Sequence, residues 1–185
     1  MSEIERHPWD AAPPGRLGQI VEAARELLER EGRDALTMRR VAERLGIKAP
    51  SLYKHVEDKD ELEALLIAQA LREQGASVHE ALDGQLRRGT RRARLAALGR
   101  AYRVWALAHP HLYRLATQGP LPRDRLPQGL EAWAAEPLVR VAGSESRARA
   151  IWAFAHGMTL LELDGRFPPD ADLDPAWQEG MDALA

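Results

Sequence analysis

The chain has 185 residues, of which 45% are hydrophobic and 29% charged, a balance that is ordinary for a globular protein with a buried core. It has no cysteine, which excludes a disulfide framework and a thiolate metal site. The formal net charge of −2 neither requires nor excludes nucleic acid as a partner, because phosphate contact depends on local positive charge.

Residues 1–15, MSEIERHPWDAAPPG, are rich in proline and mixed in charge, and we expect a flexible arm. They lack the basic and apolar regions of a signal peptide. No apolar run in the chain approaches the length that crosses a membrane. We therefore expect a cytoplasmic protein that has no membrane partner.

A first helix is predicted over residues 16–31, ending at Gly32, because apolar residues recur on one of its faces. The members of this face are Leu17, Ile20, Val21, Ala24, Leu27 and Leu28. Its predicted role is to cover the inner faces of the two short helices that follow, which cannot bury themselves.

The segment from Leu36 to Leu62, LTMRRVAERLGIKAPSLYKHVEDKDEL, predicts two short helices joined by a glycine turn, with a further helix starting at once. Thr37 is a suitable N-cap, and Gly46 stands where a left-handed C-cap is needed. Pro50 falls in the first turn of the second short helix, where its missing N–H does no harm. Leu52 and Val56 point inward at i and i+4. The pattern is a helix-turn-helix, whose second helix fits the major groove of DNA.

The residues GIKAPSLYKHVEDKDEL resemble the turn, the recognition helix and the start of the fourth helix of the tetracycline-repressor (TetR) family of transcription regulators. The resemblance covers about residues 16–65. Lys48 departs from it, because many members place a small hydroxyl residue there as the helix cap; a lysine at this position can reach a phosphate instead.

Roles follow from the chemistry of each side chain. Small residues at the start of the second short helix can touch a thymine methyl or a base edge, and the following residues can reach bases or backbone. The start of the first short helix can hold a phosphate through backbone N–H groups and guanidinium. The resemblance places Lys59 at a phosphate contact, and leaves His55 open between phosphate contact and packing onto the turn. The expected DNA-binding residues are Thr37, Arg39, Arg40, Lys48, Ala49, Pro50, Ser51, Tyr53, Lys54, His55 and Lys59.

Further helices are predicted over about residues 59–86, 91–108, 111–117, 128–142 and 144–165, and from about Pro175 to the end, while strand signals are almost absent. The expected fold is all-α. Residues 16–60 form a helix-turn-helix DNA-binding domain, and residues 61–185 form a helical regulatory and dimerisation domain.

A second resemblance lies in this later region. AYRVWALAHPHLYRLAT together with IWAFAHGMTLLEL is similar to the C-terminal domain that is named for its Trp, His and Gly signature and occurs in TetR-like regulators. Trp152, His156 and Gly157 match the signature.

One recognition helix reads too few base pairs for genomic specificity, so we expect a homodimer on a palindromic operator of double-stranded DNA. The last two long helices are the candidate dimer surface, and monomer core is the alternative. The candidate interface residues are Ile151, Trp152, Ala155, Met158, Thr159, Leu163, Trp177 and Met181.

Aromatic and polar residues inside the helical bundle are candidates for a small-molecule effector site, although such residues more often form core. They are Tyr102, Trp105, Leu112, Tyr113, Trp133 and His156. His109 and His111 diverge at helical spacing and have no further ligand nearby, so neither a metal nor a cofactor is expected. The arginine run at 87, 88, 91, 92 and 94 is interpreted as a solvated face or as partners of nearby acids, with extra DNA contact as the alternative.

No catalytic motif is present, so we expect no enzyme activity. The sequence predicts a DNA-binding regulator, in the first instance a repressor that a small molecule releases. The alternatives are a regulator without a ligand, and a helical binding protein or enzyme that does not act on DNA.

Overall fold

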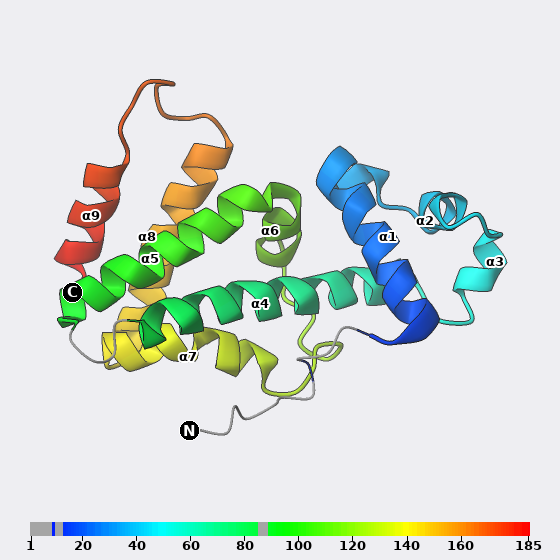
Figure 1. Ribbon diagram of the computed structural model, residues 1–185, viewed down its shortest axis with the longest axis horizontal. Helices are drawn as coiled ribbons and strands as arrows, with labels where there is room; N and C mark the ends of the chain where they lie inside the picture. Colours follow the sequence, from blue (N-terminus) through cyan, green and yellow to red (C-terminus); the bar gives the residue numbers. More distant parts are fainter. Residues whose placement is uncertain (1–8, 10–12, 85–88) are drawn as a thin grey trace. The chain divides into compact units, whose positions relative to one another are not determined.

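The computed structural model describes Trp9, residues 13–84 and residues 89–185, and within these ranges it contains helices and no strand (Figure 1). The predicted all-α fold is therefore confirmed. The expected arm over residues 1–15 lies largely outside the described residues. None of the described helices is long and apolar enough to cross a membrane.

The described residues pack into two compact units. The first contains residues 13–72 and His109–Leu130, and the second contains Glu73–Ala108 and Glu131–Ala185. The sequence places a domain boundary at residues 60 and 61, whereas the compact unit around the short helices also takes in residues 61–72 and the later segment.

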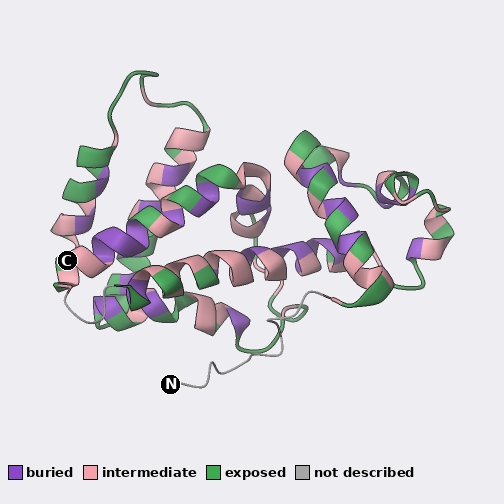
Figure 2. Cartoon of the chain, in the orientation of Figure 1, coloured by how far each residue is buried: buried purple, intermediate pink, exposed green. Residues whose placement is uncertain are grey.

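The first unit is built around α1 (Gly15–Glu31), which packs against η1 (Arg33–Ala35), α2 (Met38–Arg44) and α6 (Pro110–Thr117). α2 in turn packs against α3 (Ala49–Leu52). Buried residues recur along α1 between exposed ones, as Figure 2 shows. They are Ile20, Val21, Ala23, Ala24, Leu27 and Leu28, which confirms the predicted face except for the half-buried Leu17.

The second unit is centred on α5 (Arg91–Ala108), α8 (Glu145–Leu163) and α9 (Asp174–Ala183), each of which packs against the other two. Arg103 of α5 ties them together, since its guanidinium contacts Glu162 of α8 at 2.9 Å and Asp174 of α9 at 2.6 Å. The indole N–H of Trp177 donates to the other oxygen of Glu162. These polar contacts cross-link three helices whose apolar faces form the core.

α4 (Lys59–Asp83) contributes residues to both units and shows why a glycine can stand inside a helix. Its interior Gly75 lies against the indole of Trp133 on α7 (Leu130–Ala142), and a Cβ at Gly75 would lie 2.5 Å from a ring carbon. The same indole stacks on the imidazole of His79 at a centroid distance of 4.7 Å. Gly75 therefore makes room for an aromatic ring, and the helix continues past it to Asp83.

Most observed helix ends differ from the predicted ones by only a few residues. The helix expected over 59–86 ends at Asp83, and the one expected over 144–165 is α8, Glu145–Leu163. Ser144 caps α8 as predicted, because its hydroxyl accepts from the backbone N–H of Arg147 at 3.3 Å. The sequence did not predict the short helix η1.

Candidate nucleic-acid interface

The start and the end of α2 have the geometry that the sequence predicts. The Thr37 hydroxyl accepts a hydrogen bond from the backbone N–H of Arg40 at 3.3 Å. At the other end Gly46 has φ +65, and its N–H donates to the Glu43 carbonyl at 3.1 Å. The N–H of Ile47 donates to the Ala42 carbonyl at 3.0 Å, which completes a Schellman motif. The backbone is thus turned sharply between α2 and α3.

α3 is a single short turn of helix that is held by its apolar residues. Lys48 is its N-cap residue and makes no side-chain capping bond, while Pro50 occupies the first turn. Leu52 and Val56 are buried, as predicted from their spacing. The Leu52 carbonyl accepts from the N–H groups of both His55 and Val56, so the chain keeps turning after the assigned helix ends.

The remaining side chains of this turn are accessible. Tyr53 has 54% of its surface exposed although it is aromatic, and Lys48, Pro50, Lys54 and His55 are also exposed. Ala49 and Ser51 are half-buried. Burial of Leu52 and Val56 beneath them gives α3 and the turn that follows it one packed side and one polar, basic side. A large exposed aromatic residue beside lysines is typical of a surface that contacts a partner.

The basic residues of α2 differ in how they are engaged. The Arg39 side chain is 84% exposed, and within the described part of the chain it pairs with Glu43, four residues further along the same helix, at 2.7 Å. Arg40 instead donates to both oxygens of Glu31 on α1, at 2.7 and 2.9 Å. Arg39 is therefore the more available of the two for a phosphate, while Arg40 links α2 to α1.

Arg44 makes a second link between α2 and α1 that sequence reasoning missed. Its guanidinium donates to the Glu26 carboxylate on α1. The Arg44 hydrogen bond and charge lower the pKa of Glu26. Glu26 and Arg44 are 18 residues apart, and no repeating pattern in the sequence indicates that they pair. Only the packing of α1 against α2 brings them together.

Lys59, the first residue of α4, is half-buried and shares an acidic partner. Its Nζ lies 3.4 Å from Oε1 of Glu63, whose other oxygen binds Arg33 at 2.7 Å. Since Arg33 already compensates the nearly buried Glu63 carboxylate, Lys59 can turn towards a phosphate without leaving that charge unpaired.

The start of α4 is tied to a distant loop. Asp58 caps the helix by accepting from the N–H of Glu61 at 2.7 Å, and Arg125 binds both oxygens of Asp58 at 2.8 and 3.2 Å. The hydrogen bond from Arg125 is the largest cause of the lowered pKa of Asp58. Arg125 lies in the proline-rich loop after α6, which the sequence shows only as a loop, so its partner could not be foreseen.

The candidate dimer residues divide by burial. Ile151, Ala155, Thr159, Trp177 and Met181 are buried within the chain, where they form core of the second unit. Met158 and Leu163 are half-buried, and Trp152 has 47% of its surface exposed. Of the candidate interface residues, only Trp152 is therefore classed as exposed in this chain.

The candidate effector residues fall in different units. Leu112 and Tyr113 belong to the first unit and are fully buried there. Tyr102 and Trp105 are buried in the second unit, whereas Trp133 and His156 are half-buried. Burial lowers the pKa of the His156 imidazole, which stacks on Trp152 at a centroid distance of 5.4 Å. The structure thus does not gather all six residues into one unit.

The two other patterns singled out in the sequence have local partners. His109 lies 3.7 Å from the Glu29 carboxylate, and the described residues contain no group of three or more potential metal ligands. In the arginine run, Arg92 pairs with Asp182, as the interpretation of partners of nearby acids expects, whereas Arg91 donates to the backbone carbonyl of Ala142 at 2.9 Å. Residues 87 and 88 of this run lie outside the described residues.

This geometry, a capped α2, a glycine turn and a short α3 with an exposed basic face, is that of a helix-turn-helix DNA-binding protein. Residues 20–64 match the family described as bacterial regulatory proteins, tetR family. Residues 95–184 match the tetracyclin repressor-like C-terminal domain.

Individual proteins agree with these matches. An HTH-type transcriptional regulator of Mycobacterium tuberculosis is 35% identical over 94% of this chain and 83% of its own length. The class D tetracycline repressor of Escherichia coli is 48% identical over 28% of this chain and 22% of its own length. The crystal structure of TetR-Q116A from Acinetobacter baumannii AYE in complex with minocycline has a TM-score of 0.65 at 27% identity, covering 93% of this chain and 94% of its own. The chain belongs to the TetR family of helix-turn-helix transcriptional regulators.

Proposed function

We propose that this regulator is a homodimeric repressor, that it binds a palindromic operator through the exposed face of α3, and that a small molecule releases it. The observation that carries the proposal is the division of α3 and the turn that follows it into a buried side, Leu52 and Val56, and an exposed side with Tyr53, Lys54 and His55. A helix that is packed on one side and basic on the other is suited to the major groove.

The proposed contacts fall into two groups. Ala49, Pro50 and Ser51 face base edges together with Tyr53 and Lys54, because they stand on or beside the exposed turn. Backbone phosphates are contacted by a second set, which positions the protein without reading sequence. This set is Thr37, Arg39, Arg40, Lys48, His55 and Lys59; in it Arg40 must share its guanidinium with Glu31.

Variants of Lys59 and Ser51 distinguish the proposed phosphate contacts from the proposed base contacts. Lys59→Ala should weaken binding to all duplexes alike and lower the slope of log affinity against log salt by about 1. Ser51→Ala should instead change which bases are preferred at one position of a site selected from a random duplex pool. Fluorescence anisotropy at several salt concentrations measures the affinity and its salt slope, and sequencing of the duplexes selected from the random pool measures the base preference. A protein whose duplex binding is absent, or independent of salt, would be the helical binding protein or enzyme that is the rival interpretation.

We place the dimer contact on the accessible side of α8. Ala153 and Leu161 are exposed and Gly157 lies midway between them, so all three share one face at i, i+4 and i+8. Leu161 is a large apolar residue of this face and is 42% exposed. Trp152 is 47% exposed but stands nine residues earlier, about half a turn away around the helix, so it lies outside this face. A Cβ at Gly157 would meet nothing within 4 Å in the chain itself, which leaves room for a second helix to approach closely.

Leu161→Arg tests this contact because it puts a charge on the face without touching the core. The variant should sediment as a monomer and lose operator binding while keeping its helical circular dichroism. Arg140→Gln, an exposed change on α7 and therefore away from this face, is the control and should remain dimeric. A monomeric unaltered protein would reject the homodimer.

Two buried polar atoms support an effector site in the second unit. The Oγ1 of Thr159 on α8 and the Nε2 of Gln74 on α4 are buried, and neither has a hydrogen-bond partner among the described residues. A buried polar group without a partner is costly, and a ligand that hydrogen-bonds to it removes that cost. Tyr102, Trp105, Trp133 and His156 belong to the same unit. Leu112 and Tyr113 belong to α6 in the first unit. We keep them among the proposed effector residues only because they pack that helix.

Release is then a coupling between effector and DNA, usually about 1–3 kcal/mol. A compound screen for operator release by anisotropy should yield an effector, and Thr159→Val should weaken the response while leaving affinity for DNA unchanged. If no compound class releases the protein, the regulator without a ligand is the better description.

A further inference from the structure

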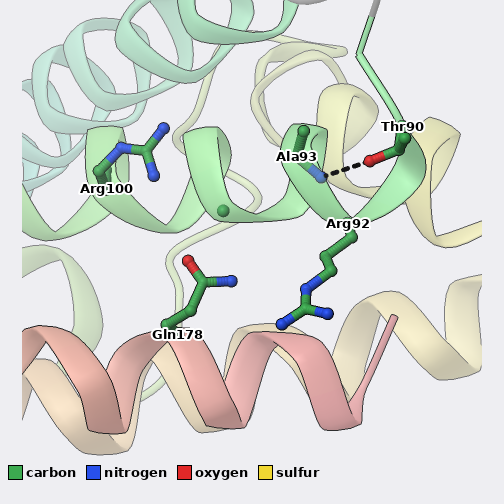
Figure 3. A pocket seen from close by; sticks show the side chains of 6 residues that line it. Thr90, Arg92, Ala93, Arg100 and Gln178 are labelled. Carbon is green, nitrogen blue, oxygen red and sulfur yellow. Dashed lines mark hydrogen bonds between the residues drawn. The ribbon is translucent and has the colours of Figure 1, made fainter.

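A groove of about 340 Å³ lies between α5 and α9 in the second unit (Figure 3). None of the residues proposed above for DNA, dimer or effector contact lines it. Its lining is rich in basic and amide side chains, and includes no carboxylate: Thr90, Arg92, Ala93, Ala96, Arg100 and Gln178. The volume is at the lower end of the range, about 300–1,000 Å³, in which small-molecule sites fall.

One end of the groove is an arginine held in place. Arg92 pairs with Asp182 of α9, and Gln178 donates to the same carboxylate at 2.8 Å. Burial acts to raise the pKa of Asp182, but the hydrogen bonds from Gln178 and Arg92 outweigh it and hold the pKa below its ordinary value. A guanidinium has five N–H donors, so Arg92 keeps donors for a second acceptor after binding Asp182.

The other end is Arg100, which is exposed and makes no hydrogen bond or ion pair with any residue in the described part of the chain. It stands eight residues after Arg92, which is about 12 Å along the helix axis. Figure 3 shows the Arg92 and Arg100 side chains at the two ends of the groove, with Gln178 between them on the facing helix. Ala93 and Ala96 form a small apolar wall.

The start of α5 adds positive potential at the Arg92 end. Thr90 caps the helix, its hydroxyl accepting from the Ala93 N–H at 3.2 Å. The first turn of an 18-residue helix carries a partial positive charge. Positive charge therefore stands at both ends of a short apolar wall.

We propose that this groove binds a small, elongated organic dianion of the dicarboxylate class. One carboxylate is bound by Arg92 at the start of α5, the other by Arg100, and the chain between them lies along Ala93 and Ala96. The planar fork of each arginine matches the two oxygens of one carboxylate. The two arginines stand about 12 Å apart along the helix axis, which favours an elongated dianion over a compact anion that can reach only one of them.

Isothermal titration calorimetry of the full chain with succinate, glutarate and adipate tests the class. At least one of them should bind, and butyrate should bind about tenfold more weakly because it loses one of two charge-assisted contacts. Inorganic phosphate is the compact-anion arm. Equal or tighter binding of phosphate, or no binding of any dicarboxylate at millimolar concentration, overturns the proposal.

Arg100→Gln tests the site itself, because Arg100 has no partner in the described residues whose loss would disturb the fold. It should weaken dicarboxylate binding about tenfold or more. Arg140→Gln removes the same charge from an exposed position on α7 that does not line the groove, and should leave binding unchanged. Equal weakening by both variants, or none by Arg100→Gln, overturns the proposal. No DNA is present, so the result is independent of the proposed repressor function.

Discussion

The two units of this regulator are stabilised in different ways. In the first unit α2 and α3 are too short to bury much surface, and they depend on caps, a glycine turn and ion pairs such as Arg40–Glu31 to α1. In the second unit, long helices interlock through large side chains seated on glycines, with Trp133 on Gly75 and Phe154 on Gly180. A DNA-reading surface needs its side chains outside, so its stability must come from the backbone and from links to neighbours.

The largest difference should appear when an aromatic residue is removed from each unit. Trp177→Ala empties a position that is 6% exposed and should cost about 3–5 kcal/mol of unfolding free energy. Tyr53→Ala, at the exposed end of α3, should change stability by no more than about 0.5 kcal/mol and weaken DNA binding instead. Urea unfolding followed by circular dichroism, beside anisotropy on duplex DNA, separates the two. A large stability loss at Tyr53 would contradict the division.

A pair of glycines tests the interlocking directly. Gly75→Ala places a Cβ 2.5 Å from the Trp133 ring and should lower the free energy of unfolding by about 1–2 kcal/mol, since overpacking exceeds the gain in helix propensity. Gly157→Ala meets nothing within 4 Å and should raise it by about 0.5–1 kcal/mol in a monomeric background such as Leu161→Arg. If both variants change the free energy of thermal unfolding in the same direction, then the Trp133 ring does not require the absence of a side chain at position 75.

The cap of α2 should have a smaller effect on stability, of about 1 kcal/mol. Thr37→Ala removes the acceptor for the Arg40 N–H and should destabilise the first unit by that amount. Thr37→Ser keeps the hydroxyl and is the control, with near-normal stability expected. Hydrogen exchange of the α2 amides reports the local change, and equal protection in both variants would argue against the cap.

The smallest effect is the pH dependence of the Arg125–Asp58 pair, which is partly exposed. Because the folded pKa of Asp58 lies below its ordinary value of 3.8, the pair stabilises the fold fully above that pH. The stabilisation is lost as the pH falls through the folded pKa. Arg125→Ala should therefore lower stability at pH 7 and reduce the further loss on acidification, measured by urea unfolding at pH 7 and pH 3. An unchanged pH dependence would mean that the pair contributes nothing measurable.

Local chemistry made much of the helix-turn-helix predictable from the sequence. The Thr37 cap, the positive φ of Gly46, and the buried spacing of Leu52 and Val56 each depend on a few neighbouring residues, and all are confirmed. The candidate dimer face was less predictable, because Ile151, Ala155 and Thr159 have the same apolar periodicity whether they face a partner or the core. All three residues are buried within the chain, which favours the alternative of monomer core.

The amino-acid sequence by itself determined the all-α class, the order of the helices and the helix-turn-helix, since helix periodicity and capping act over a few residues. Only the tertiary structure decided which long-range partners meet, such as Arg44 with Glu26, Arg125 with Asp58, and Trp133 with Gly75. It also formed the groove between Arg92 and Arg100, which needs α9 beside α5. Such pairings join residues far apart in the chain, and no local pattern encodes the packing that brings them together.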